Sequence, residues 1–219
     1  MIPIRDINKS RSFPLVNIAL IVISSLVWLF EAGLDEQRMN ALVYSYGLVP
    51  AEVFHKPYTL LTHMFLHGSW LHIIGNMWFL WVFGDNVEDR LGKVKYLIFY
   101  LLSGAGAAFL QTFVSFLLGG TSVPMVGASG AISGVMGAYL WMFPYARILS
   151  LVPVFFVLTF MEVPAVFFIG LWIIIQVING ILTLPFAKFG GVAWFAHIGG
   201  FGVGYILARI FYKKGRYYF

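Results

Sequence analysis

The chain alternates long stretches that lack charged residues with short clusters of charge. The longest uncharged stretch is the 51 residues 96–146, and two others are 12–30 and 57–84. A helix needs roughly 20 apolar residues to cross the hydrocarbon core of a bilayer. The pattern therefore predicts an all-α membrane protein with six transmembrane helices, at 13–31, 70–86, 95–117, 128–143, 163–183 and 194–212.

The third and fourth predicted helices share the longest uncharged stretch, and the turn-like sequence "GGTSVP" at 119–124 separates them. The fourth helix is short. Its sixteen residues rise only about 24 Å, against a hydrocarbon core of about 30 Å.

The segment 148–161 is ambiguous because it has only 14 residues and contains Pro153. Cationic residues concentrate on the cytoplasmic side of membrane proteins. Six spans with the N-terminus inside place 11 of the 14 Lys and Arg residues there, and a seventh span would move the last four outside. We therefore interpret 148–161 as an interfacial or re-entrant connector, with Glu162 and Pro164 starting the fifth helix. The eleven residues are Arg5, Lys9, Arg11, Arg90, Lys93, Lys95, Arg147, Arg209, Lys213, Lys214 and Arg216.

The first external loop, residues 32–69, is the longest connection between predicted helices. Its 38 residues mix charged, aromatic and proline residues. Structureless loops of that length are uncommon in compact domains. We therefore expect this loop to fold on or into the membrane surface.

Composition supports a membrane protein with one embedded domain. The 219 residues are 60% hydrophobic and 11% charged, with a mean hydropathy of +0.87, whereas soluble proteins carry about 25% charged residues. The net charge of +5 is explained by the cytoplasmic loops without nucleic acid. The chain has no Cys, which excludes disulfides and thiol catalysis. We divide it into a cytoplasmic segment 1–12, a membrane core 13–212 and a basic cytoplasmic tail 213–219, with the first span uncleaved.

Four polar residues fall at one depth of the predicted bundle. His72 and Asn76 share a face near the start of the second span, Ser129 opens the fourth, and His197 lies near the start of the sixth. These three spans run in the same direction, so the four side chains should lie together below the outer surface. Polar residues inside a membrane are costly and by default suggest a functional site.

Small residues predict close contact between the fourth and sixth spans. Small residues at a spacing of four let two helix backbones approach, and this approach would bring Ser129 within hydrogen-bond reach of His197. Glycine ridges alone are more often only packing. The two ridges are Gly130, Gly134 and Ala138 in one span, and Gly200, Gly204 and Ala208 in the other.

Other chemistries fit less well. His63 and His67 have the spacing of a metalloprotease pair, but no Glu follows His63. Residues 127–131 do not form G-x-S-x-G, so no hydrolase elbow is indicated. No acid lies beside His197, so any nucleophilic site would use a Ser–His dyad. A channel or transporter would need a polar path through both leaflets, which the inner halves of the spans lack.

In these motifs the chain resembles the rhomboid intramembrane serine proteases. The matching pieces are "HGSWLHIIGN" (67–76), "GDNVEDRLG" (84–92), "GASGAISG" (127–134) and "AHIGGFGVG" (196–204). They occur in this order on a six-span plan, over nearly the whole chain. The resemblance implies a six-helix rhomboid bundle with a large membrane-associated first external loop.

The resemblance also implies roles for individual residues. Ser129 would be the nucleophile and His197 its general base and later acid. His72, Asn76 and the backbone N–H of Ser129 would form the oxyanion hole. The supporting residues would be Gly127 and Gly130 beside the nucleophile, His67 near the cavity mouth, and Ser133.

The chain departs from the family pattern at one single residue and at one pair of residues, and neither departure removes a catalytic group. Ser133 stands where many members have an aromatic residue under the histidine ring. Tyr58 and Thr59 stand where the family has a Trp-Arg pair in the first loop. What orients the histidine and what anchors the loop are therefore open at this point.

The implied activity is cleavage of transmembrane protein substrates in or near their membrane segment. It would need no organic cofactor, metal or nucleic acid, and its partners would be the substrates and the lipid bilayer. The loop 184–193 would cap the cavity. The expected location is the plasma (inner) membrane, with both termini cytoplasmic and the site toward the outer face. The alternative is a rhomboid-like protein that binds client helices without cutting them. The sequence leaves the oligomeric state open.

Overall fold

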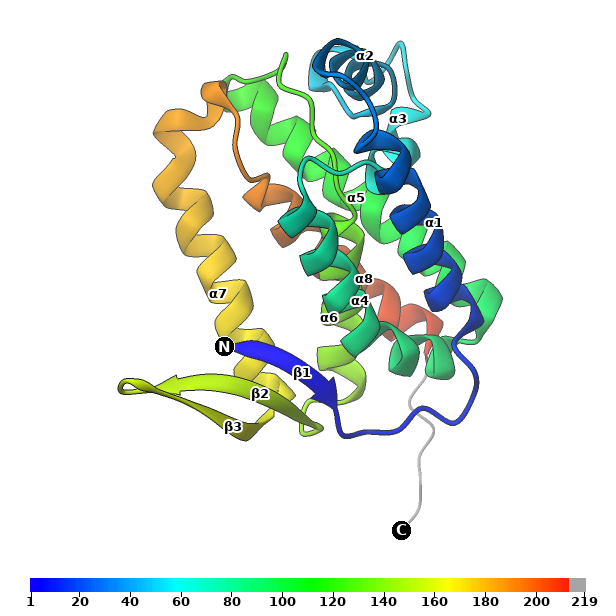
Figure 1. The fold of residues 1–219 in the computed structure, drawn as a ribbon, viewed down its shortest axis with the longest axis vertical. Helices are drawn as coiled ribbons and strands as arrows, with labels where there is room; N and C mark the ends of the chain where they lie inside the picture. Colours follow the sequence, from blue (N-terminus) through cyan, green and yellow to red (C-terminus); the bar gives the residue numbers. More distant parts are fainter. Residues whose placement is uncertain (213–219) are drawn as a thin grey trace.

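Helices built from the uncharged stretches pack side by side in the computed structural model, which describes residues 1–212 (Figure 1). Each of the six predicted spans is helical. Within the described residues, three segments are long and apolar enough to cross a membrane, Lys93–Leu118, Ala165–Phe186 and Trp194–Phe211, and Leu15–Glu31 is a shorter apolar helix. The predicted tail 213–219 lies outside the described residues. The six helices are α1 (Leu15–Glu31), α4 (Trp70–Leu91), α5 (Lys93–Leu118), α6 (Ser129–Met142), α7 (Ala165–Thr183) and α8 (Trp194–Phe211).

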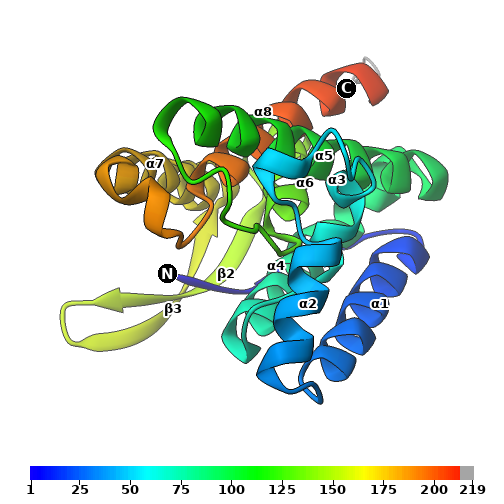
Figure 2. The same ribbon diagram turned by 90° about the horizontal axis from the view of Figure 1, so that it is seen from above.

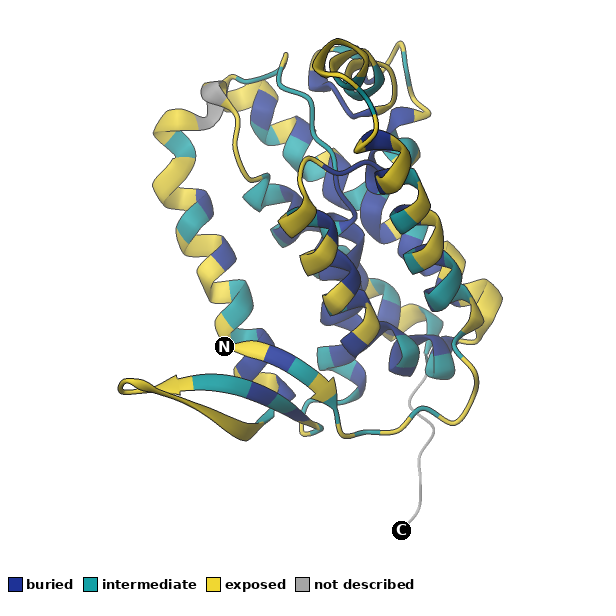
Figure 3. Ribbon diagram, in the orientation of Figure 1, coloured by how far each residue is buried: buried dark blue, intermediate teal, exposed yellow. Residues whose placement is uncertain are grey.

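Helix α6 lies at the centre of the bundle and is buried along most of its length, whereas α7 at the periphery exposes one apolar face (Figures 2 and 3). The predicted contact between α6 and α8 is confirmed. A Cβ added to Gly200 would overlap the carbonyl of Gly130, and one added to Gly204 would overlap the backbone of Gly134. The two backbones therefore touch along the ridges of small residues.

This contact gives a prediction about stability. We expect Gly204→Ala to lower the unfolding midpoint in detergent, by the equivalent of about 1–3 kcal/mol, because its methyl group meets backbone that cannot turn aside. Gly202→Ala on the same helix is the matched control, since no atom lies within 4 Å of its added Cβ. That control should be neutral or slightly stabilising, because alanine favours helix over glycine. Equal effects of the two substitutions would contradict the close contact.

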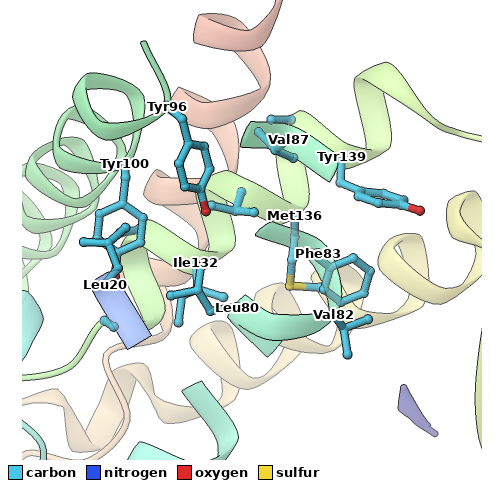
Figure 4. Packing of buried hydrophobic residues seen from close by; sticks show 14 of the residues in the cluster. Leu20, Leu80, Val82, Phe83, Val87, Tyr96, Tyr100, Ile132, Met136 and Tyr139 are labelled. Atoms are coloured by element: carbon cyan, nitrogen blue, oxygen red, sulfur yellow. The ribbon is translucent and has the colours of Figure 1, made fainter. Parts of the chain in front are cut away.

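A large apolar core joins α1, α4, α5 and α6. Leu80, Phe83, Tyr96, Met136 and Tyr139 are buried in it (Figure 4). The side chains are large and close-packed, so the relative positions of these helices are fixed by shape as well as by burial. This core holds α4 and α6 together beneath the end of the bundle at which Ser129 lies.

Polar contacts inside the bundle fix the position of α1. The carboxylate of Glu88 accepts hydrogen bonds from the backbone N–H groups of Val16 and Asn17, which have no acceptor within their own helix. The hydroxyl of Tyr96 donates to Oδ1 of Asn17 at 2.7 Å, and Nδ2 of Asn17 donates to the carbonyl of Leu80 at 3.1 Å.

A three-stranded antiparallel sheet lies across the end of the bundle opposite Ser129 (Figure 1), so the all-α prediction is wrong in this part. Its strands are β1 (Ile2–Asp6), β2 (Arg147–Val154) and β3 (Val157–Pro164), in that order. The predicted connector 148–161 is therefore most of a β-hairpin. Eight of its 14 residues are β-branched or aromatic, and these types favour strands.

The start of the fifth helix was also predicted wrongly. Glu162 lies in β3 and forms an ion pair with Arg147 at 3.4 Å across the hairpin. Helix α7 begins at Ala165, directly after Pro164. Glu162 pairs with Leu149 in the sheet, so the helix begins after it instead of at it.

The first loop contains α2 (Glu36–Tyr46), α3 (Thr59–Thr62) and the 3-10 turns η1 (Pro50–Glu52) and η2 (His63–Phe65). It is anchored by side chains that reach the end of α2. Tyr58 Oη donates to the carbonyl of Ser45 at 3.1 Å, and Thr62 Oγ1 donates to that of Tyr46 at 2.6 Å. Tyr58 therefore supplies an anchor at one of the positions where the family pattern is missing.

Candidate active site

Ser129 and His197 lie within hydrogen-bond distance in the structure. Ser129 is the first residue of α6 and His197 is in the first turn of α8. Ser129 Oγ lies 2.8 Å from Nε2 of His197. The close backbone approach at Gly130 and Gly200, one residue and three residues away, makes this distance possible.

Gln176 on α7 holds the other side of the imidazole ring. Its Nε2 donates to the carbonyl of Trp172 at 3.0 Å, so its Oε1 is the atom that faces Nδ1 of His197 at 2.9 Å. An amide oxygen accepts only, hence Nδ1 carries the proton and Nε2 is left as the acceptor for the hydroxyl of Ser129. This is the tautomer that a serine nucleophile requires.

Gln176 is not among the site residues predicted from the sequence, although its position carries a signal. Gln176 is a polar side chain in a highly apolar predicted span, and such residues mark functional sites by default. Its exposed fraction is only 5%. What the sequence could not give is the rotation of α7 that points this residue at His197.

Two aromatic rings pack against the His197 ring, and neither comes from α6. The ring centroids of Trp172 and Trp194 lie 6.0 Å and 5.9 Å from that of His197. Ser133, at the position of the absent aromatic, is buried and donates its hydroxyl to the carbonyl of Ser129 at 2.6 Å. Ser133 therefore bonds to its own helix, and tryptophans from α7 and α8 pack around the histidine.

Gly127 brings the chain before Ser129 against His72 and Asn76. Its φ of +123° is open to glycine, and an added Cβ would lie 2.6 Å from Nε2 of His72 and 3.7 Å from Nδ2 of Asn76. Nδ1 of His72 accepts from the N–H of Gly68 at 3.4 Å, so Nε2 is the donor on the Gly127 side.

Hydrogen-bond donors without an acceptor lie near Ser129. Nδ2 of Asn76 is buried and finds no acceptor among residues 1–212. The N–H groups in the first turn of α6 lack intrahelical acceptors, as at every helix start. Buried donors of this kind normally have a partner, so the arrangement suits an incoming oxygen atom.

His67 lies beside this group without joining it. Its ring is 5.1 Å from that of His72, and its backbone N–H donates to Oε2 of Glu31 at 3.1 Å. Burial, together with the neighbouring His72, lowers the pKa of His67 to about 4. His67 is therefore uncharged at neutral pH. His63, also buried, contacts the carbonyl of Thr59 through Nδ1 and supports the loop.

A cavity of about 800 Å³ connects these residues. Its walls come from the start of α4, from 123–136, from α7 and from the segment 184–193 that was predicted to cap it. In that segment Gly190 and Gly191 have φ values of +85° and +128°, which glycine adopts readily. The cavity's lining includes Ser129, His197, His72, Asn76 and Gln176.

Fold and site together define a multi-pass membrane protein in which a partly buried serine at the start of the central helix α6 meets a buried histidine of α8. Comparison with known proteins identifies its family. The profile of the Rhomboid domain matches residues 55–214. The chain belongs to the rhomboid family.

Several relatives in Arabidopsis thaliana align with most of the chain. RHOMBOID-like protein 4 is 32% identical over 72% of this chain and 35% of its own length. RHOMBOID-like protein 1 is 30% identical over 85% of this chain and 41% of its own length. "RHOMBOID-like protein 6, mitochondrial" is 31% identical over 71% and 44%. The chain thus spans less than half the length of these relatives.

Proposed function

We propose that this protein is an intramembrane serine endopeptidase that cuts transmembrane proteins in or near their membrane segment. The hydrogen bond between Ser129 Oγ and Nε2 of His197, with Nδ1 held by Gln176, carries the proposal. A serine and a histidine that only join two helices would not need a fixed tautomer, a cavity and unpaired donors beside them.

The reaction would follow the acyl-enzyme route. Ser129 Oγ adds to the carbonyl carbon of the scissile peptide bond while Nε2 of His197 takes the hydroxyl proton. The C–N bond then breaks, the leaving amine receives that proton, and the acyl group stays on Ser129 as an ester. His197 next takes a proton from water, which adds to the ester. Return of the proton to Ser129 releases the new carboxyl terminus.

The negative charge on the tetrahedral intermediate would be stabilised by fixed donors. Nδ2 of Asn76, Nε2 of His72 and the backbone N–H of Ser129 are the candidates. Each such donor is worth about 2.7–4 kcal/mol in a site shielded from water. Gly127 contributes by letting the chain before Ser129 pass close to the His72 ring.

Gln176 acts as a positioning residue in this proposal. We expect Gln176→Leu to lower kcat about tenfold with little change in KM, because the lost hydrogen bond is worth about 0.5–1.5 kcal/mol and fixed the reactive tautomer. Ile175→Ala, an exposed neighbour on the same helix, is the control. Turnover by Gln176→Leu equal to that of wild type would show that the tryptophans alone orient His197.

The wider arrangement is also proposed. Residues 13–212 form the six-span core, with 1–12 and 213–219 in the cytoplasm and Ser129 toward the outer face of a plasma (inner) membrane. The ends of α4, α6 and α8 remote from Ser129 meet around Arg90, which lies over the rings of Phe143 and Tyr212 at 5.1 Å and 6.0 Å. Positive charge at that end supports a cytoplasmic location.

The test is cleavage of a membrane-anchored reporter in vesicles. The purified chain is reconstituted with a single-span test protein that carries a fluorescent tag outside and a Gly-rich segment at the outer end of its helix. Such a segment unwinds more easily, which frees a peptide carbonyl for attack. We expect release of the tag, dependent on Ser129. A reporter that co-purifies with the protein but stays uncut would favour the client-binding alternative and contradict the proposal.

A further inference from the structure

The turn between β2 and β3 presents an exposed apolar surface. Phe155 and Phe156 are 95% and 104% exposed, and Val157, Leu158 and Phe160 are each more than 60% exposed. Soluble surfaces rarely expose contiguous apolar patches of this kind, and such patches mark interaction sites. Since β3 carries apolar residues at successive positions, both faces of the outer hairpin are apolar.

The backbone of the turn adds to this evidence. Phe155 has a φ of +53°, and within the described residues every other positive φ belongs to a glycine. It is the first of two residues in the hairpin loop, where a positive φ at that position strongly favours glycine. A phenylalanine at this position is unfavourable for the backbone. We therefore expect its exposed side chain to make an interaction that offsets this cost.

The hairpin is held in a fixed place by polar contacts at the other edge of the sheet. Oδ2 of Asp6, at the end of β1, accepts from Tyr139 Oη and from Nδ2 of Asn86, both at 2.6 Å. The sheet is thus tied to α6 and α4. From there β2 and β3 run across the bundle end and project beyond α7 in both views (Figures 1 and 2).

The exposed surface of the hairpin continues into that of α7. Pro164 ends β3 and Ala165 begins α7, whose outward residues Val166, Phe167 and Leu171 are exposed and apolar. Ala165–Phe186 is long and apolar enough to cross a membrane, so the hairpin leaves the bundle at the level where α7 enters the hydrocarbon.

We infer that the β2–β3 hairpin is an interfacial membrane anchor, with Phe155 and Phe156 inserted among the lipids of the leaflet at the end of the bundle opposite Ser129. The sheet order sets the depth of insertion. β3 is the outer strand, so its free backbone groups need water or headgroups and are not tolerated in the hydrocarbon centre. Aromatic side chains at the boundary and backbone at headgroup level satisfy both requirements. The anchor is independent of the proposed catalysis.

The chain offers a direct test because it contains no cysteine. Phe156→Cys is labelled with an environment-sensitive fluorophore and reconstituted in phosphatidylcholine vesicles. Phe167→Cys, on the exposed face of α7, provides the lipid reference, and Lys9→Cys, exposed in the segment after β1, provides the aqueous one. Aqueous iodide and a nitroxide-labelled lipid are the two quenchers.

We expect the label at 156 to be quenched by the lipid nitroxide about as strongly as the label at 167, and several-fold less by iodide than the label at 9. Iodide quenching equal to that at 9 would overturn the inference. Protection from both quenchers would overturn it too, because it would indicate a protein strand on the edge of β3 instead of lipid.

Discussion

Ser129→Ala should reduce cleavage of the membrane-anchored reporter by at least about a thousandfold, because the substitution removes the proposed attacking oxygen. His197→Ala should have a loss of similar size, since the hydroxyl then keeps its proton. The two losses should not add in the double variant, because the two residues act as one unit. Initial rates of tag release in vesicles measure all three.

Ser133→Ala is the matched control for the nucleophile. Both serines lie in α6, and Ser133 only donates to the carbonyl of Ser129 within its own helix. We expect this variant to keep most of the activity and the unfolding midpoint. If Ser133→Ala lost as much activity as Ser129→Ala, or if Ser129→Ala still cleaved the reporter at the rate of wild type, the assigned nucleophile would be wrong.

Asn76→Ala should lower kcat by about 10²–10³-fold and leave KM nearly unchanged. Its amide nitrogen is buried without an acceptor, so the donor is expected to be used only when charge develops on the substrate oxygen. Loss of one such donor from an oxyanion hole has an effect of this size. Reporter titrations in vesicles give kcat and KM separately.

Ile74→Ala controls for changes to α4, because Ile74 is exposed on the same helix two residues away. It should leave both constants unchanged. An Asn76→Ala enzyme with a raised KM and unchanged kcat would show that Asn76 holds the substrate equally before and during the reaction. In that case Asn76 would not belong to the oxyanion hole.

The helical parts of the fold could be predicted from the sequence because the patterns that mark them are local. Uncharged stretches locate the helices, and the spacing of Gly130, Gly134, Gly200 and Gly204 predicts which two approach. Given alternating helix directions, Ser129 and His197 must then come to one depth. These inferences need only the helical period and the number of spans.

The missed features depend on contacts between distant segments. The sheet requires the hairpin 147–164 to pair with the first residues of the chain. No local pattern indicates that a strand will pair with another strand about 145 residues away. The position of Gln176 depends on how α7 is rotated about its own axis, which its neighbours α8 and β3 decide. The absence of an aromatic residue at Ser133 indicated that support must come from elsewhere, without saying from where.

Helix packing and the proposed chemistry depend on the same residues in the stretch around Ser129, the proposed nucleophile. Gly127 turns the chain against His72, and Ser129 starts the helix whose first N–H groups are free. Gly200 and Gly204 of α8 then lie directly against the backbone of Gly130 and Gly134, which brings His197 close to Ser129. A side chain at Gly127 would meet the His72 ring, and one at Gly200 would meet the carbonyl of Gly130, so either would disturb the arrangement of the proposed catalytic groups.

Covalent labelling of the purified protein tests the central claim most directly. The chain is treated in detergent with a fluorophosphonate, which reacts with activated serines, and is then analysed by intact mass and peptide mass spectrometry. We expect one adduct, on Ser129, absent in Ser129→Ala and strongly reduced in His197→Ala. No adduct on the folded protein, or equal labelling of wild type and Ser129→Ala, would contradict the account.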